Sequence, residues 1–518
     1  MASRAGEVRR APGAAAIAAL VVTLTLGMAV VVGKGAGSLR PTPADWSALR
    51  FTVLQAGLSA SLSCLLAVPV ARALARRRFA GRGLLISLMG APFLLPVIVA
   101  VLGLLAVFGR GGLVNDALSL TGLPRLSVYG LHGVVLAHVF LNLPLATRML
   151  LMGWQAIPAE RFRLAASLGM PQGAMFRHLE VPMLRAVLPG AAVVIFTICL
   201  ASFAVALTLG GGPGATTVEL AIYQALRFDY DPARAATLAL IQFALGAGAV
   251  ALGWVALTSA GFGAGLGRQM DLAAPKGWRR AVDALAITLA AAFLLLPLGA
   301  VVVRGVPGLS DLPQGLGMAL LRSISVALAS TVVTSGAALI LSLAVARRAS
   351  GARLFDAVAV LPLAVSGLVL GTGLFLTLRS LVRPEDIALP VTVLVNALLS
   401  LPYAYRLLLP EARALCADYG RLSDSLALRG VARLRWITLP RLARPLGFGA
   451  GVAAALSMGD LGVITLFAGE SGATLPLYVH RLMGAYRMEA AAGAALVLVA
   501  ASFALFALFD GIGRRAAP

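Results

Sequence analysis

Charged residues are scarce in this sequence, and their scarcity excludes an ordinary soluble domain. Only 12% of the 518 residues are charged, while 60% are hydrophobic. A soluble domain carries about 25% charged and about 45–50% apolar residues. One helical crossing of a bilayer needs about 20 mostly apolar residues, and many segments of this chain meet that requirement. We therefore expect an all-α polytopic membrane protein.

Cysteine and lysine are also rare. The three cysteines, Cys64, Cys199 and Cys416, are too few and too scattered for a disulfide framework. A phosphate-binding P-loop needs a lysine followed by serine or threonine, but Lys34 and Lys276 are the two lysines and glycine follows each. Any ATP hydrolysis that drives this chain therefore belongs to another polypeptide.

Twelve apolar segments are long enough to cross a membrane. With the amino terminus in the cytoplasm, most of the 43 lysines and arginines fall on the cytoplasmic side. The net charge of +22 then reflects the positive-inside bias rather than nucleic-acid binding, and both termini are expected in the cytoplasm. The expected spans are residues 14–32, 51–74, 84–108, 128–152, 186–209, 233–258, 281–303, 319–346, 354–378, 387–410, 446–468 and 488–511.

A polar loop occurs twice. Residues 163–182 and 421–440 lie 258 positions apart and are identical at seven of twenty positions. Each half has six expected spans, so both enter the membrane in the same direction, as in a parallel repeat. The expected divisions are a first half at 1–258 with a polar loop at 155–182, a cytoplasmic linker at 259–280, and a second half at 281–518 with a polar loop at 411–440.

Each polar loop is expected to contain two short helices. In the first loop, one helix ends at Gly169, a typical terminating residue. Pro171 can begin a second helix, which would run to about Leu179 and stop before Pro182. Such a short helix is marginal alone in water, so it needs a surface on which to dock.

The spacing in these loops resembles the EAA loop of ABC-importer permeases. The family's Glu-Ala-Ala start is replaced by segments that begin at Arg163 and Arg421, and Ala427 stands where a glycine is usual. The spacing of a glycine, nine residues, an aliphatic residue, any residue and an aliphatic–proline pair matches Gly169, Leu179, Val181 and Pro182 in the first loop and Ala427, Ile437, Leu439 and Pro440 in the second.

The resemblance implies that the two loops couple the chain to an ATP-binding subunit, which would carry the ATP and Mg; no cofactor is expected in this chain. We call residues 155–182 and 411–440 the first and second coupling loops. Arg177 and Arg435 would lie on the docking helices. There they either pair with acidic groups of the ATPase or only add to the positive-inside charge.

A closer resemblance covers nearly the whole chain. The segments "LGGGPGATTVELAIYQALRFDYDPARAATLALIQ" (209–242) and "LSMGDLGVITLF" (456–467) are similar to bacterial ABC permeases for thiamine and thiamine diphosphate. This implies a type I importer permease fold in the inner membrane, two copies of an ATP-binding subunit, and a periplasmic thiamine-binding protein. Ferric iron, phosphonate or a polyamine is the alternative cargo. A secondary transporter that needs no ATPase is the rival class, because it also has two parallel six-span halves.

Polar residues inside the spans are candidates for the transport pathway. Asp460 lies in the eleventh span, and Ser202 occupies the duplicated position. Asp460 either attracts a cationic cargo or is a buried carboxylate that accepts hydrogen bonds from nearby amides. His138 and Asn142 share one helix face and either line the pathway or bond between helices. No cluster of ligands accompanies His138, so metal binding is not expected.

One outer segment combines charged and aromatic residues. Mixed charge with aromatics suits a surface that docks a protein, and a solvated turn is the alternative. The residues proposed for docking of the binding protein are Glu219, Tyr223, Arg227, Asp229 and Asp231. Arg148 and Arg406, at the inner ends of their spans, are interpreted as arginines that reach toward the membrane surface.

Overall fold

The computed structural model describes residues 11–35, 41–256, 277–469 and 472–517. Most of the linker expected at 259–280 lies outside these residues. Within them, every regular element is a helix. Eleven helices of the described residues are long and apolar enough to cross a membrane, and the number is twelve if the pair 352–364 and 367–378, bent by 91°, is counted as one span. The expected all-α polytopic fold is confirmed. The third span differs from the expected 84–108, because Pro96 begins a new helix and the apolar helix there covers Val97–Leu120.

The helices before residue 257 are α1 (Pro12–Val22), η1 (Thr23–Gly27), α2 (Met28–Gly35), α3 (Pro43–Arg76), α4 (Arg82–Leu88), α5 (Ala91–Leu94), α6 (Val97–Phe108), α7 (Leu113–Leu120), α8 (Leu131–Ala156), α9 (Ala159–Ser167), α10 (Gln172–Met175), η2 (Phe176–Glu180), α11 (Val181–Leu200), α12 (Ala204–Leu209), η3 (Pro213–Ala215), α13 (Val218–Arg227) and α14 (Pro232–Ala256).

The helices after residue 276 are α15 (Trp278–Gly308), η4 (Leu309–Asp311), α16 (Leu316–Ala346), α17 (Ala352–Val360), η5 (Leu361–Ala364), α18 (Gly367–Leu378), α19 (Ala388–Ser425), α20 (Gly430–Arg433), η6 (Leu434–Thr438), α21 (Leu439–Met458), α22 (Gly462–Phe467), α23 (Leu475–Gly484) and α24 (Met488–Ala516). From α8 and α19 onward the two series follow the same order, except that α19 continues through the stretch that α9 forms separately and η3 has no counterpart among the described residues. Even single hydrogen bonds recur: the Val218 amide donates to Thr52 Oγ1 (2.9 Å), and the Leu475 amide to Ser323 Oγ (2.8 Å).

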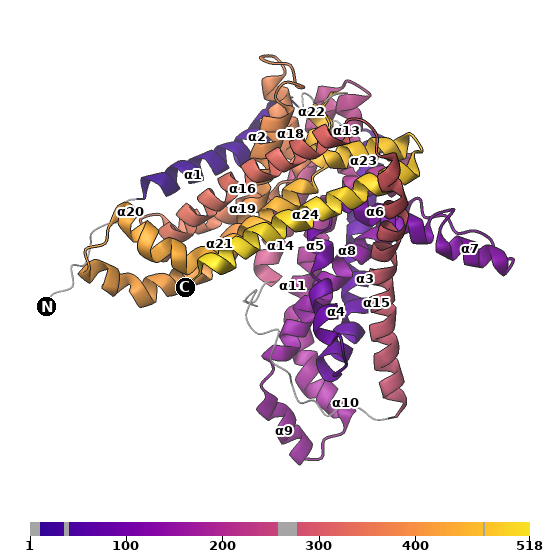
Figure 1. Ribbon diagram of the computed structural model, residues 1–518, viewed down its shortest axis with the longest axis horizontal. Helices are drawn as coiled ribbons and strands as arrows, with labels where there is room; N and C mark the ends of the chain where they lie inside the picture. Colours follow the sequence, from indigo (N-terminus) through magenta and orange to yellow (C-terminus); the bar gives the residue numbers. More distant parts are fainter. Residues whose placement is uncertain (1–10, 36–40, 257–276, 470–471, 518) are drawn as a thin grey trace. The chain divides into compact units, whose positions relative to one another are not determined.

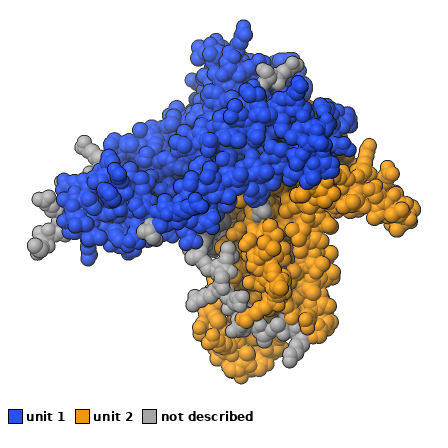
Figure 2. Space-filling model, viewed as in Figure 1, with its two compact units in different colours: residues 1–41, 221–244, 305–518 blue, residues 42–220, 245–304 orange. Residues whose placement is uncertain are grey.

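The chain forms two compact units (Figure 2). Unit 1 holds residues 1–41, 221–244 and 305–518, and unit 2 holds residues 42–220 and 245–304. Relative to the sequence halves, the units have exchanged their first helices. Helices α1 and α2 pack against α16, α17 and α18 of the second half (Figure 1). Helix α15 packs within unit 2, where the Phe293 ring lies 5.8 Å from that of Phe140.

Each unit has a core of long helices that pack closely. In unit 2, α3, α8 and α11 bury their facing sides against one another, and α3 begins with a capping box between Thr42 and Asp45. In unit 1, α16, α19, α21 and α24 pack together. A Cβ on Gly447 of α21 would come within 2.5 Å of the Phe509 carbonyl oxygen of α24. Small residues at such crossings let helix backbones approach closely in membranes.

The coupling loops differ from the expectation of separate short helices. The helix after Pro171 does not stop before Pro182, because α10, η2 and α11 run on without a break. In the second loop, α19 continues from the span to Ser425. A turn of π-helix allows the helix of the first loop to continue past Pro182, because the Val181 amide donates a hydrogen bond to the Phe176 carbonyl. The wider turn relieves the clash that a proline causes inside a regular α-helix.

Candidate coupling loops and membrane-embedded polar clusters

One residue at the same position of each coupling loop has a backbone in the left-handed conformation. Gly169 has φ +65° and Ala427 has φ +49°. The next residue's amide bonds back in the same way, Met170 to the Ala165 carbonyl (3.0 Å) and Leu428 to that of Ser423 (2.9 Å). Alanine is uncommon with positive φ, so the turn is kept in the second loop at the expense of backbone strain.

Both coupling loops present arginine and apolar side chains to solvent. The arginines expected to couple, Arg163, Arg177, Arg421 and Arg435, are exposed, and Leu179 and Ile437 are partly buried. Pro182 and Pro440 lie in the first turns of α11 and α21. Leu168 is 69% exposed, and in the second loop Val431 and Trp436 are 78% and 68% exposed. Exposed apolar residues gathered in one place indicate a protein contact, and sequence reasoning missed Trp436.

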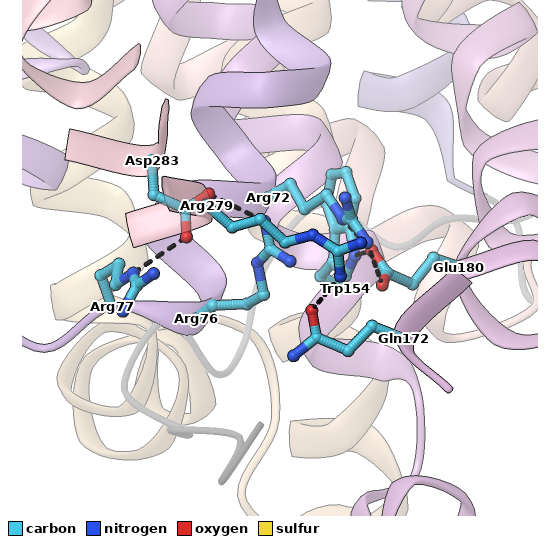
Figure 3. Close-up of polar contacts among 8 residues, drawn as sticks. All are labelled: Arg72, Arg76, Arg77, Trp154, Gln172, Glu180, Arg279 and Asp283. Atoms are coloured by element: carbon cyan, nitrogen blue, oxygen red, sulfur yellow. Dashed lines mark hydrogen bonds and ion pairs between the residues drawn. The ribbon is translucent and has the colours of Figure 1, made fainter. Parts of the chain in front are cut away.

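A buried glutamate anchors the first coupling loop (Figure 3). Glu180, 3% exposed, accepts hydrogen bonds from Arg72 Nε (2.7 Å) and Nη2 (2.9 Å) of α3. It also accepts one from Trp154 Nε1 of α8 (3.0 Å). A two-point bond between guanidinium and carboxylate fixes orientation as well as distance. The loop is therefore tied to two membrane helices through one side chain, which sequence reasoning did not single out.

Three further hydrogen bonds tie α15 to α3 and to the first coupling loop (Figure 3). Asp283 of α15 accepts from Arg76 Nη2 (2.8 Å) and Arg77 Nε (2.9 Å) at the end of α3. Arg279 donates to the Gln172 side chain at the start of α10 (2.7 Å). Since Asp283 is 5% exposed, the two guanidiniums compensate the cost of burying its charge.

The second coupling loop is anchored by apolar packing instead. Ala412, Leu415 and Leu442 form a buried cluster, against which Tyr419 and Ile437 pack. The Arg441 guanidinium lies 4.6 Å from the centre of the Tyr419 ring. Thr438 occupies the position of Glu180 and bonds only to the backbone of its own turn, at the Arg433 carbonyl (3.3 Å).

A polar cluster is buried between the helices of unit 2. His138 Nδ1 lies 3.3 Å from Ser59 Oγ, and the Asn142 side chain donates to Cys199 Sγ (3.4 Å). The Gln55 side chain donates to the Cys199 carbonyl (2.8 Å). His138 and Asn142 are each 4% exposed, so in this conformation they bond between helices. No group of three or more potential metal ligands occurs among the described residues.

Unit 1 has a corresponding cluster at the duplicated positions. Asn396, which corresponds to His138, donates to Ser457 Oγ (3.0 Å), and Ser330 donates to the same atom (2.9 Å). Thr334 bonds across to the Ala397 carbonyl (3.1 Å). Both units therefore place polar side chains at the same depth of the same helices.

Ser202 and Asp460 lie where the long helices break. Ser202 separates α11 from α12, and Asp460 separates α21 from α22. One carboxylate oxygen of Asp460 accepts from the Gly462 amide (3.1 Å), as the structural alternative proposed. Its other oxygen and Ser202 Oγ are buried and have no hydrogen-bond partner among the residues that the structure describes. An unpaired buried polar atom is costly, and both atoms remain candidates for contact with a transported molecule.

The residues expected to dock a binding protein are only partly at the surface. Glu219 is 2% exposed, because α13 directs it into the packed interior. Tyr223 is half-buried, and burial raises its pKa while Arg227 acts in the opposite direction. Asp229 pairs with Arg234 (2.9 Å), and Asp231 caps α14 at the Arg234 amide (2.9 Å). Arg227, Asp229 and Asp231 are exposed.

Two duplicated sets of apolar helices, polar clusters within them and solvent-exposed polar loops define a multi-pass membrane permease. No family model matches the chain. The thiamine transport system permease protein ThiP of Salmonella typhimurium is 41% identical over 98% of this chain and 97% of its own length. The protein of the same name from Brucella abortus is 39% identical over 90% of this chain and 87% of its own length. The chain belongs to this family of thiamine transport system permeases.

A more distant relative shows the wider class. The molybdenum transport system permease protein ModB of Mycobacterium bovis is 34% identical over 218 residues, which are 41% of this chain and 82% of ModB. A relative that matches less than half of the chain fits the duplicated architecture. Together these relatives place the chain among ABC permeases, which are transport proteins rather than enzymes.

Proposed function

We propose that this chain is the membrane-spanning subunit of an ATP-driven importer that carries thiamine and its phosphates into the cytoplasm. The observation that carries the proposal is the similarity to thiamine permeases along nearly the whole chain. The duplicated coupling loops support it, because a transporter without an ATPase needs no such loops. The cargo site would open alternately to each side of the membrane as the two repeats move.

ATP hydrolysis is assigned to a separate subunit, present in two copies. One copy would bind each coupling loop through the exposed arginines and apolar residues described above. Because the ATPase is cytoplasmic, both coupling loops and both chain termini would face the cytoplasm, and the protein would lie in the bacterial inner membrane. Helix α19 would connect the span to the loop turn, since its 38 residues, which include Pro402 and Pro410, are about 57 Å long at 1.5 Å per residue.

A periplasmic thiamine-binding protein would deliver the cargo. Its docking surface would include Arg227, Asp229 and Asp231, which are exposed on one corner between α13 and α14. Within the membrane, Asp460 would attract the positive thiazolium ring of thiamine, since one of its oxygens is unpaired. His138, Asn142 and Ser202 would border the pathway when the helices separate.

Uptake of labelled thiamine into a strain that lacks its own thiamine permease tests the proposal. Co-expression of the partner ATPase and binding protein should restore uptake, and ferric iron, phosphonate or polyamines should not compete. Trp436→Ala should reduce both uptake and recovery of the ATPase with the purified chain. Uptake by vesicles that lack any ATPase would favour a secondary transporter and contradict the proposal. Normal uptake by Asp460→Asn would remove the charge role of Asp460 alone.

A further inference from the structure

An open cavity of about 590 Å³ lies in unit 1 at the end that carries the second coupling loop. Its walls come from the end of α16, the start of α17 and the part of α19 that begins the loop. Three arginines line it, Arg348, Arg353 and Arg413, together with Asp356 and Cys416. No function described above uses this cavity.

The cavity carries uncompensated positive charge. In the part of the chain that the structure describes, none of the three guanidiniums lies within ion-pair distance of a carboxylate. Asp356 is the one acidic residue in the lining, and its Oδ1 accepts a hydrogen bond from the Tyr405 hydroxyl (2.6 Å). Three positive groups around one concave surface attract an anion more strongly than the same groups spread over a flat one.

The corresponding place in unit 2 shows what the cavity lacks. There, Arg76 and Arg77 at the end of α3 are neutralised by Asp283 of α15. In unit 1, α1 takes the place of α15 and packs against α16 and α17, but its residues Pro12–Val22 include no acidic side chain. Residues Pro12–Val22 therefore offer Arg348, which lines the cavity, no counterpart of Asp283.

We propose that this cavity is a binding site for a phosphate ester. Guanidinium groups match phosphate in geometry and charge and bind it through paired hydrogen bonds. In the proposed orientation the cavity faces the cytoplasm, where two sources of this chemistry exist: soluble phosphate esters and the headgroups of anionic phospholipids. Basic pockets between membrane helices on the cytoplasmic side bind such headgroups. The site does not depend on the identity of the cargo.

Cys416 provides a local probe of occupancy. It lines the cavity and is partly exposed, whereas Cys64 and Cys199 are buried, so a maleimide should label Cys416 first in the full chain purified in detergent. Sodium diphosphate should slow this labelling in a saturable way. In the double variant Arg348→Gln/Arg353→Gln, about tenfold more diphosphate should be needed for the same protection, because two charged contacts are lost.

The control variant is Arg514→Gln/Arg515→Gln. It removes the same charge at the same end of unit 1, where α24 passes α21, and should retain full protection. Bilayer discs of phosphatidylcholine, with or without phosphatidylglycerol, separate the two sources. Protection by diphosphate in pure phosphatidylcholine indicates a soluble ligand, and protection that requires phosphatidylglycerol indicates a headgroup. If neither anion protects Cys416, or if both double variants lose protection equally, the proposal is overturned.

Discussion

The two coupling loops share a backbone and differ in how they are held. Both have a left-handed turn, at Gly169 and at Ala427, and both pass through a turn of π-helix before the next span. The first loop is tied by the ion pair of Glu180 with Arg72, whereas the second is held by the apolar cluster around Leu442. The two halves therefore share the backbone geometry of the coupling loop, and different side-chain interactions hold that geometry in place.

The largest effect is expected from removing the ionic anchor of the first loop. Glu180→Ala should lower the free energy of unfolding by about 3 kcal/mol, because it leaves Arg72 and Trp154 without their buried acceptor. Thermal unfolding of the purified chain measures the loss. In the assembled importer, more ATP should be hydrolysed per thiamine transported. Thr438→Ala, at the same position of the second loop, should change stability by less than about 1 kcal/mol; equal losses in both variants would break the comparison.

The second effect concerns the apolar anchor. Leu442 is 1% exposed within its cluster, and Leu442→Ala should lower the free energy of unfolding by about 2–3 kcal/mol by leaving a cavity. Leu184→Ala, at the same position in the first half, is the control. Leu184→Ala should lower the free energy of unfolding by clearly less than Leu442→Ala does, because the ion pair of Glu180 still holds the first loop. Denaturant unfolding of both variants measures the difference, and a larger loss for Leu184→Ala would contradict the assignment of the two anchors.

A third, smaller effect tests the role of α15. Asp283→Asn removes the charge that holds Arg76 and Arg77 and should lower the free energy of unfolding by about 1–2 kcal/mol. Asp311→Asn is the matched control, since Asp311 is 73% exposed and lies 3.8 Å from Arg487. An exposed pair contributes about 0–1 kcal/mol. Calorimetry should rank the two variants in this order, and the reverse order would show that α15 is held by other contacts.

The smallest changes in the free energy of unfolding are expected from exchanging the turn residues of the two loops. Gly169→Ala should destabilise the first loop by about 1 kcal/mol, because its positive φ disfavours alanine, although no atom lies within 4 Å of the added Cβ. Ala427→Gly should relieve the same strain and raise or leave unchanged the free energy of unfolding. Protease sensitivity of the loops, compared between the two swaps, gives the sign. Destabilisation by both swaps would mean that the two turns are not equivalent.

Most of the spans and the turn at Gly169 could be predicted because each depends on local pattern. A long apolar segment indicates a membrane span directly. The spacing between the turn residue and the following proline is the same in both loops because both adopt the same backbone conformation. The Glu180 anchor could not be predicted, since Arg72 lies 108 residues away and nothing local marks it as a partner. Trp436 was missed because an aromatic residue in a polar loop gives no sign of its exposure.

Two other outcomes depended on tertiary packing alone. Glu219 belongs to a mixed, polar segment that looks solvated, yet one turn of α13 directs it inward. The exchange of α1 and α15 between the units could not be predicted, because the apolar stretches of the two helices would fit either neighbour and the partners of Asp283 lie more than 200 residues away. Local sequence indicates that such a helix crosses the membrane and leaves open which bundle receives it.

The exchanged first helix also has a consequence for biogenesis. Helix α1 packs on α16 and α17, which leave the ribosome roughly 300 residues later, and at 5–20 residues per second that delay is about 15–60 s. During this time α1 sits in the lipid without its permanent neighbours. Unit 1 can be completed only after most of the second half has been inserted, so a truncated product retains an unmatched span that quality-control proteases can recognise.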